Sequence, residues 1–198
     1  MNFPAAEIEQ TLSDHQPTVL SLEERRHAAV AMILRGLPSR PEMLFIKRAR
    51  RDGDPWSGDL GFPGGKVEPV DGSPRVAAER ETHEEVGLKL ETARLLGRLD
   101  DISGAHQPIV ISCFVYGLCR PAPVRFSEEV TEAFWFPLRK LLDPSLHIEA
   151  TVHFRGEPMR RPAIRLLEPG QPVLWGITYR LVLQLVRLLE NPSPDQAG

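Results

Sequence analysis

The stretch that decides the fold is GGKVEPVDGSPRVAAERETHEEVGL, which occupies Gly64–Leu88. Within it, Ser73 is a favoured helix N-cap residue and Pro74 suits the first helical turn. Gly87 suits the position just after a helix end, where the backbone turns left-handed. The segment therefore predicts a helix over Pro74–Val86, preceded by a glycine loop.

Three glutamates fall on one side of this expected helix. Glu81, Glu84 and Glu85 are spaced i, i+3 and i+4, so they lie within an arc of about 100°. Their mutual repulsion would be offset by a divalent cation, because clustered carboxylates are hard ligands of the kind that Mg²⁺ or Mn²⁺ prefers. The alternative is an ordinary solvated helix face. The Gly64–Gly65 pair favours the metal site, since such loops bring backbone groups close to phosphate oxygens.

The helix sequence also resembles a known family. The run RETHEEVGL over Arg80–Leu88 is similar to the second half of the Nudix box, G-x5-E-x7-R-E-U-x-E-E-x-G-U, where U is aliphatic. Thr82 occupies the first aliphatic position of this half and is a mild departure. The resemblance implies a Nudix-type α/β/α sandwich with a mixed β-sheet.

The first half of the box departs more strongly. Gly72 stands where the family has a glutamate and Lys66 where it has a glycine, so the loop is one residue longer than usual. Glu68 and Asp71 are both available to replace the missing acid. The longer form, G-G-x-x-acid-x-x-D, resembles the coenzyme A pyrophosphatase branch of the Nudix hydrolases, and the Gly64–Gly65 pair and both acids fit it.

Later segments extend this resemblance over most of residues 27–189. Phe134–Leu138 resembles that branch's strand after its variable loop, and Trp175–Thr178 resembles the start of its last helix. Before the Gly-Gly pair, however, the Arg and His of the branch's coenzyme A signature are replaced by Asp54 and Trp56. The resemblance therefore favours a coenzyme A-like substrate, although the coenzyme A signature of this sequence is incomplete.

The resemblance implies hydrolysis of a pyrophosphate bond in a nucleoside diphosphate derivative, dependent on Mg²⁺ or Mn²⁺. A (d)NTP, ADP-ribose or dinucleotide substrate is the alternative within this class. A non-catalytic, nucleotide-binding regulatory domain is the alternative from another class, and a plain interaction scaffold is a third. Phosphoryl transfer depends mainly on positioning and charge stabilisation. A metal ion held by carboxylates is therefore sufficient for an enzyme of this kind.

The resemblance also assigns provisional roles to individual residues. The implied metal ligands are the three glutamates and the backbone carbonyl of the second loop glycine: Glu81, Glu84, Glu85 and Gly65. The expected catalytic residues are Glu84, Arg80 and Glu129, with Arg80 orienting the glutamates. The general base stays open among Glu128, Glu129 and His106.

Substrate binding is expected from a basic strand end and a neighbouring tryptophan. Lys47, Arg48, Arg50 and Arg51 place four positive charges in five residues, and Arg48 and Arg51 are the expected phosphate contacts. Solvation of these side chains is an equally weighted alternative. Trp56 is expected to bind substrate by stacking, with anchoring of its own loop as the alternative.

Apolar runs and turn residues predict the other elements. The expected strands are His27–Leu34, Met43–Arg48, Ala93–Asp100, Pro108–Leu118 and Glu132–Pro137. A short helical turn is expected over Leu138–Leu142 and a last helix, apolar on more than one side, over Trp175–Glu190. Strands and helices in this irregular order favour a mixed sheet.

Composition limits the class of protein. The 198 residues include 24 Lys+Arg and 27 Asp+Glu, a net charge of −3, and 41% are hydrophobic. This balance argues against a broadly basic nucleic-acid surface and against a disordered acidic chain. The length predicts one Nudix domain over residues 23–190, with a polar N-terminal arm at 1–22 and a C-terminal tail at 191–198.

The two cysteines and the apolar runs indicate the cellular compartment of the protein. Cys113 and Cys119 make neither a disulfide framework nor a zinc set, and Cys113 is expected to be a buried, inert thiol. Residues 1–16 lack the apolar core of a secretory signal, and the run at 173–189 contains too many polar residues to span a bilayer. We expect a cytoplasmic protein without membrane contact, in which the last helix could form a homodimer interface.

Overall fold

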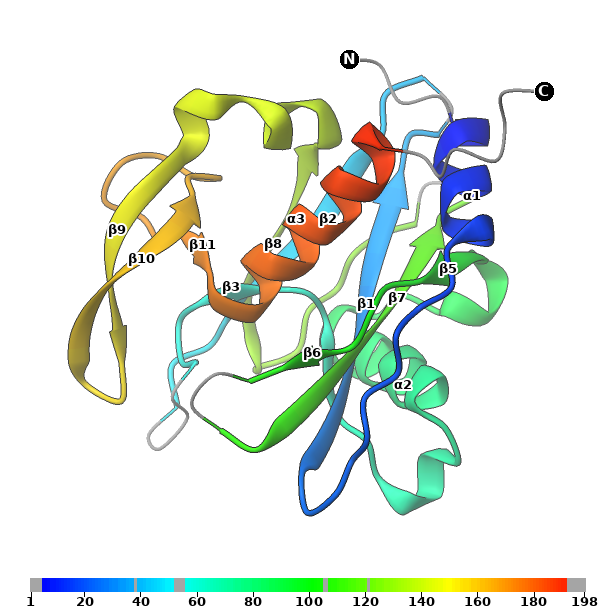
Figure 1. The fold of residues 1–198 in the computed structure, drawn as a ribbon, viewed down its shortest axis with the longest axis horizontal. Helices are drawn as coiled ribbons and strands as arrows, with labels where there is room; N and C mark the ends of the chain where they lie inside the picture. Colours follow the sequence, from blue (N-terminus) through cyan, green and yellow to red (C-terminus); the bar gives the residue numbers. More distant parts are fainter. Residues whose placement is uncertain (1–4, 38, 52–55, 105–106, 121, 192–198) are drawn as a thin grey trace.

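The computed structural model describes residues 5–37, 39–51, 56–104, 107–120 and 122–191 (Figure 1). The α-helices of this part are α1 (Ala5–Asp14), α2 (Pro74–Val86) and α3 (Gly176–Glu190). The strands are β1 (Arg26–Arg35), β2 (Glu42–Arg48), β3 (Leu60–Gly61), β4 (Gly64–Lys66), β5 (Arg94–Arg98), β6 (Ile102–Ser103), β7 (Ile109–Gly117), β8 (Val130–Pro137), β9 (His147–Phe154), β10 (Glu157–Ile164) and β11 (Leu174–Trp175). Short 3₁₀ turns are η1 (Pro69–Asp71), η2 (Leu90–Thr92), η3 (Leu138–Leu142) and η4 (Pro144–Leu146).

Strand β1 is the centre of a mixed sheet. It runs parallel to β7 along its whole length and pairs antiparallel with β4 at its start and with β2 at its end. The main order is β3-β2-β1-β7-β5, with β4 on β1, β6 on β7 and β8 on β2. Because β1 diverges from β2, the short strand β4 takes the place beside its first residues. This places the Gly64–Gly65 loop at the middle of the sheet.

Helices cover both faces of this sheet. Alternate β1 residues Ala29, Ala31 and Ile33 pack with Ala77 and Ala78 of α2 in one buried cluster. The intervening β1 residues join a larger cluster with α1, α3 and the 3₁₀ turn η3. Figure 1 shows α3 crossing the sheet on this second side, next to α1. The expected α/β/α sandwich with a mixed sheet is confirmed.

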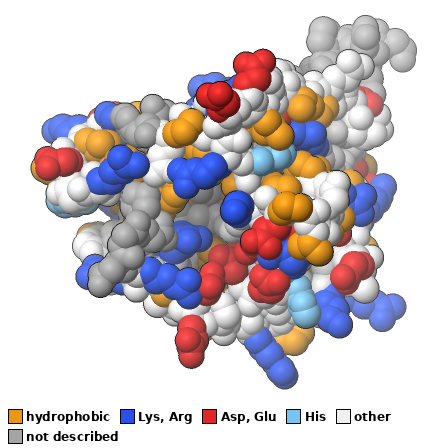
Figure 2. Space-filling model, turned by 90° about the horizontal axis from the view of Figure 1, so that it is seen from below, with side chains coloured by type: hydrophobic (Ala, Val, Ile, Leu, Met, Phe, Trp, Pro, Cys, Tyr) orange, Lys and Arg blue, Asp and Glu red, His pale blue; other side chains and the backbone are white. Residues whose placement is uncertain are grey.

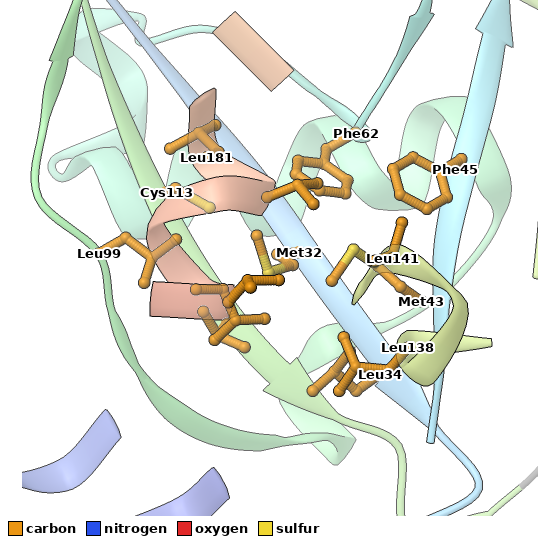
Figure 3. Close-up of a cluster of buried hydrophobic side chains, with 14 of the residues drawn as sticks. Met32, Leu34, Met43, Phe45, Phe62, Leu99, Cys113, Leu138, Leu141 and Leu181 are labelled. Atoms are coloured by element: carbon orange, nitrogen blue, oxygen red, sulfur yellow. The ribbon is translucent and has the colours of Figure 1, made fainter. Parts of the chain in front are cut away.

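The larger cluster is a well-filled apolar core (Figure 3). Met32 and Leu34 from β1 meet Met43 from β2 and Leu181 from α3, and each is at most 1% exposed. Cys113 of β7 lies among them, fully buried, and burial raises the pKa of its thiol. The expectation that this thiol is buried is therefore confirmed.

The predicted elements of the central region are present. Helix α2 has the predicted bounds: Ser73 Oγ accepts the Val76 N–H, and Gly87 adopts φ 71° just after the last turn. The six other expected strands and helices appear as β1, β2, β5, β7, β8 and α3, with ends at most two residues from those expected, and the turn at 138–142 appears as η3. Local signals were sufficient here because each element combines a clear apolar pattern with capping or turn residues.

The N-terminal segment differs from the expected polar arm. Residues 5–14 form α1, whose Ile8 and Leu12 are 0% and 2% exposed and belong to the larger core cluster. A Cβ at Gly97 of β5 would lie 2.6 Å from the Leu12 carbonyl oxygen, so the glycine allows this close packing. The polar composition concealed two apolar residues four positions apart, which share one helix face. The predicted tail at 191–198 lies outside the described residues apart from Asn191.

A second sheet was not predicted. Strands β9 and β10 form a hairpin, with β11 antiparallel to β10, in the order β11-β10-β9. The hairpin turns at Arg155 and Gly156, both with positive φ. Pro158 and Pro162 within β10 lower its apparent strand character, because proline donates no ladder hydrogen bond. This small sheet extends to one side of the main sheet in Figure 1, and the sequence did not indicate it.

Helix α3 packs one broad face into the core. Its buried residues are Leu181, Val182, Leu185, Val186 and Leu189. The polar residues at 180, 184 and 187 interrupt this run, as the sequence indicated. In the described part of the chain no helix combines the length and apolar character needed to cross a membrane.

The packing of α1 gives a first prediction. Leu12→Ala should lower the free energy of unfolding by about 2–4 kcal/mol, because it removes a buried side chain and leaves a cavity between α1 and the sheet. Ser13→Ala, at an exposed position of the same helix, should change it by less than about 0.5 kcal/mol. Urea denaturation measures both. Equal effects of the two substitutions would mean that α1 does not belong to the core.

Candidate active site

Helix α2 presents its three glutamates to very different surroundings. The Glu85 side chain is 3% exposed, that of Glu81 17% and that of Glu84 56%. The difference arises because α2 packs against β1 and β4, so residues facing the start of β4 are buried and those one turn away reach solvent. The three glutamates therefore differ in burial, and Glu85 is the most deeply buried of them.

Glu85 is held by the glycine loop. Its Oε2 accepts the Gly64 backbone N–H at 2.9 Å, and its Oε1 lies 3.7 Å from Nη1 of Arg48 on β2. Burial raises the pKa of this carboxyl to about 7, against the lowering effects of the Gly64 hydrogen bond and the Arg48 charge. Burial therefore disfavours the charged form of Glu85, and a nearby cation would favour it.

Glu81 fits a space that only glycine leaves open. A Cβ at Gly65 would lie 2.4 Å from the Glu81 carboxyl carbon, a distance that side chains cannot tolerate. Burial raises the pKa of Glu81, while Arg80 lowers it. Gly64 is constrained as well: its φ is 147°, and a Cβ there would lie 2.3 Å from the Ala29 carbonyl oxygen. The loop thus needs both glycines, one for the sheet and one for the carboxylate.

Arg80 links the acids of the site. Its Nη1 donates to Glu81 Oε1 and to Glu84 Oε2, both at 3.0 Å. On its other side, Nε and Nη2 donate to the two Asp71 carboxylate oxygens at 2.7 and 3.1 Å. This paired contact holds the pKa of Asp71 below its usual range. Arg80 therefore contacts Asp71 and two of the three glutamates at the same time.

Asp71 fills the place of the acid that the motif lacks. Of the two candidates that the sequence left open, Asp71 contacts Arg80, whereas Glu68 precedes the turn η1 and its backbone N–H donates to Asp71 Oδ2 at 2.7 Å. Gly72 follows with φ 68°. The turn and this left-handed residue absorb the extra residue of the loop, so an aspartate nine positions before Arg80 reaches it. The spacing of nine positions between Asp71 and Arg80 was the sequence signal that could have identified this pair.

Glu129 faces the same group of carboxylates from another loop. Its negative charge contributes to the raised pKa values of Glu81 and Glu85, and its Oε1 lies 3.0 Å from Nη2 of Arg51. No contact of Glu128 with the site is found in the described part of the chain, and His106 lies outside that part. The structure thus brings Glu129 and Arg51 to the edge of the expected site.

Figure 2 shows acidic side chains gathered near the middle of the face seen from below, with Lys and Arg side chains around them. Among the described residues, no group of three or more His, Cys, Asp or Glu side chains is arranged so that it could hold a metal ion. The donors nevertheless fit a hard divalent cation, since Glu81 and Glu85 are carboxylates whose burial disfavours their charge. The lack of a Cβ at Gly65 also lets the Glu81 carboxylate lie directly against the glycine loop.

A cavity of about 560 Å³ begins at this site. Gly64, Gly65 and Arg48 line one part of it, and residues of β1, β7, β10, β11 and the start of α3 line other parts. Trp56 also lines the cavity, with its ring 6.4 Å from that of Phe154 at 56°. The expected substrate residues Arg48 and Trp56 thus share one cavity. Its volume is in the range of small-molecule sites.

The fold and the acid-lined glycine loop define the Nudix class, and comparison with known proteins agrees. The model of the NUDIX domain matches residues 25–155. The chain is 35% identical to an uncharacterized protein of Schizosaccharomyces pombe, over 93% of this chain and 72% of that protein. It is 31% identical to the human mitochondrial coenzyme A diphosphatase NUDT8, over 82% of this chain and 69% of that protein.

A solved structure supports the same fold. The MutT/nudix family protein from Enterococcus faecalis superposes with a TM-score of 0.56 at 17% identity, covering 94% of this chain and 69% of that one. The chain therefore belongs to the Nudix family and is a hydrolase that acts on pyrophosphate bonds.

The Arg80–Asp71 pair gives a second prediction. Asp71→Asn should lower the free energy of unfolding at pH 7 by about 2 kcal/mol, because it removes a buried charge that accepts two guanidinium hydrogen bonds. The folded pKa of Asp71 lies below its ordinary 3.8, so its stabilisation is complete above that pH and is lost as the pH falls through the folded pKa. The difference between wild type and variant should shrink accordingly.

Chemical denaturation between pH 7 and pH 2.5 measures this difference. Glu91→Gln, at an exposed position after α2, is the control and should have no comparable effect. A penalty for Asp71→Asn that stays constant down to pH 2.5 would contradict the assignment of Asp71 as an ionised partner of Arg80.

Proposed function

We propose that this chain cleaves the pyrophosphate bond of coenzyme A or a closely related nucleoside diphosphate derivative, with Mg²⁺ or Mn²⁺. The observation that carries the proposal is the cavity leading from the Gly64–Gly65 loop between the rings of Trp56, Phe154 and Trp175. Such apolar walls suit a substrate with an extended uncharged arm, whereas a nucleoside triphosphate carries only phosphate beyond its nucleoside. The coenzyme A diphosphatase among the relatives supports the same choice.

The residues proposed to hold the metal are Glu81 and Glu85, with Glu84 and the Gly65 carbonyl completing the set. The carboxylates lie on one helix directly beside the loop, and hard oxygen donors are what Mg²⁺ and Mn²⁺ prefer. When bound there, the cation supplies positive charge for the pyrophosphate oxygens. Arg80 keeps Glu81 and Glu84 in place through its two 3.0 Å hydrogen bonds.

The chain's own groups account for proton transfer and phosphate binding. A water oxygen bonds to phosphorus while the bond from that phosphorus to the bridging oxygen breaks, and the leaving phosphate takes the electron pair. Glu129 is the proposed acceptor of the water proton, since it is half-exposed and its charge acts on Glu81 and Glu85. Arg48 and Arg51 are the proposed partners of the phosphate oxygens, because guanidinium groups match phosphate geometry.

A substrate panel tests the proposal. Purified protein with Mg²⁺ or Mn²⁺ is given coenzyme A, ADP-ribose, dinucleoside polyphosphates and (d)NTPs, and products are identified by mass. We expect the highest kcat/KM with coenzyme A, and two phosphate monoesters as its products. A higher value for ADP-ribose or a (d)NTP would replace the substrate assignment. Absence of any product from folded protein would favour a regulatory, non-catalytic domain.

A third prediction concerns Glu85. Glu85→Gln should lower kcat/KM by about 100-fold or more, the scale of losing one charge-stabilising group, and should weaken Mn²⁺ binding measured by calorimetry. Its amide oxygen can still accept the Gly64 N–H, so the fold should persist. Glu91→Gln provides the matched control outside the site. Unchanged Mn²⁺ affinity in Glu85→Gln would refute the metal assignment.

A further inference from the structure

One arginine of the second sheet points into the cavity. In β10, Met159 and Arg161 are half-buried between exposed neighbours, so they share the face opposite to that of Arg160. Arg161 lines the cavity, whereas Arg160, the next residue along the same strand, is exposed and does not. The strand thus offers two adjacent arginines on opposite faces.

The charge of Arg161 is not neutralised by an acid. Its Nη1 donates to the Arg160 backbone carbonyl at 3.1 Å, and no carboxylate of the described residues lies within ion-pair distance. The same holds for two other arginines of the cavity wall: Arg26 donates to the Gln107 side chain and Arg180 to the Ser103 carbonyl. Asp59 is the one acid among the described lining residues. The cavity therefore carries a positive potential beyond the reaction site.

Arg161 and the glycine loop stand on different sheets, with the cavity between them. Gly64 and Gly65 belong to β4 of the main sheet, and Arg161 belongs to the β9–β10 hairpin. Aromatic rings lie along this wall: Phe154 is 6.5 Å from Trp175, edge to face. The hairpin side of the cavity therefore combines aromatic rings with the positive charge of Arg161.

We propose that Arg161 binds a second anionic group of the substrate, a phosphate monoester separate from the scissile pyrophosphate. Guanidinium groups bind phosphate through paired hydrogen bonds, and an arginine without a carboxylate partner keeps these donors available. Arg26 and Arg180 add to the attraction from the β6–β7 side. This inference rests on the proposed function and specifies which nucleoside diphosphate derivatives the enzyme prefers: those that carry an additional phosphate on the nucleoside.

The test compares coenzyme A with 3′-dephospho-coenzyme A, which differ by one ribose phosphate. Wild type should have the lower KM for coenzyme A. Arg161→Gln should raise that KM by about 10-fold, the scale of losing a charged hydrogen bond, with little change in kcat or in the KM for the dephospho substrate. Arg160→Gln changes the same charge on the outer face and should leave both substrates unaffected. Thermal unfolding of both variants checks that they fold.

A second measurement does not depend on turnover. Calorimetry should show tighter binding of adenosine 3′,5′-bisphosphate than of adenosine 5′-monophosphate to wild type, and loss of this difference in Arg161→Gln. Equal binding of the two nucleotides, or equal weakening of both by Arg161→Gln, would overturn the inference, as would the same effect from Arg160→Gln. Selective bisphosphate binding without hydrolysis of coenzyme A would instead contradict the proposed function alone.

Discussion

One hydrogen bond joins the two halves of the site. The Gly64 N–H donates to the Glu85 carboxylate at 2.9 Å, which ties the middle of α2 to the start of β4. Burial raises the pKa of Glu85 to about 7, so the fold holds a carboxylate whose charge is disfavoured unless a cation is close. This closeness requires the glycine at 65, because a Cβ there would collide with Glu81, whereas Gly64 is required by the neighbouring strand, where a Cβ would collide with Ala29.

The second constraint is the sharing of Arg80 among four acceptors. Its guanidinium reaches Asp71, Glu81 and Glu84 and the backbone carbonyl of Lys66. Asp71 holds one edge of the guanidinium and thereby fixes how the other side meets the glutamates. The altered first half of the Nudix box is thus compatible with its intact second half, since the 3₁₀ turn η1 brings Asp71 within hydrogen-bond distance of Arg80.

The cavity is lined by residues both inside and beyond the part of the chain that matches the Nudix domain. The match to the Nudix domain ends at residue 155, near the tip of the β9–β10 hairpin. The proposed metal ligands and Glu129 lie within the matched part. Arg161 and Trp175, which line the cavity away from the glycine loop, come after it. Segments outside the matched part are therefore suited to select among substrates without altering the carboxylate site.

The sequence by itself determined α2 with its caps, the main strands and the family, because these depend on local patterns and on a motif with fixed spacing. Only the tertiary structure decided that Asp71 rather than Glu68 meets Arg80, and that Glu85 is buried while Glu84 is exposed. It also revealed α1 and the second sheet. These features depend on contacts between residues far apart in the chain, which local periodicity does not record.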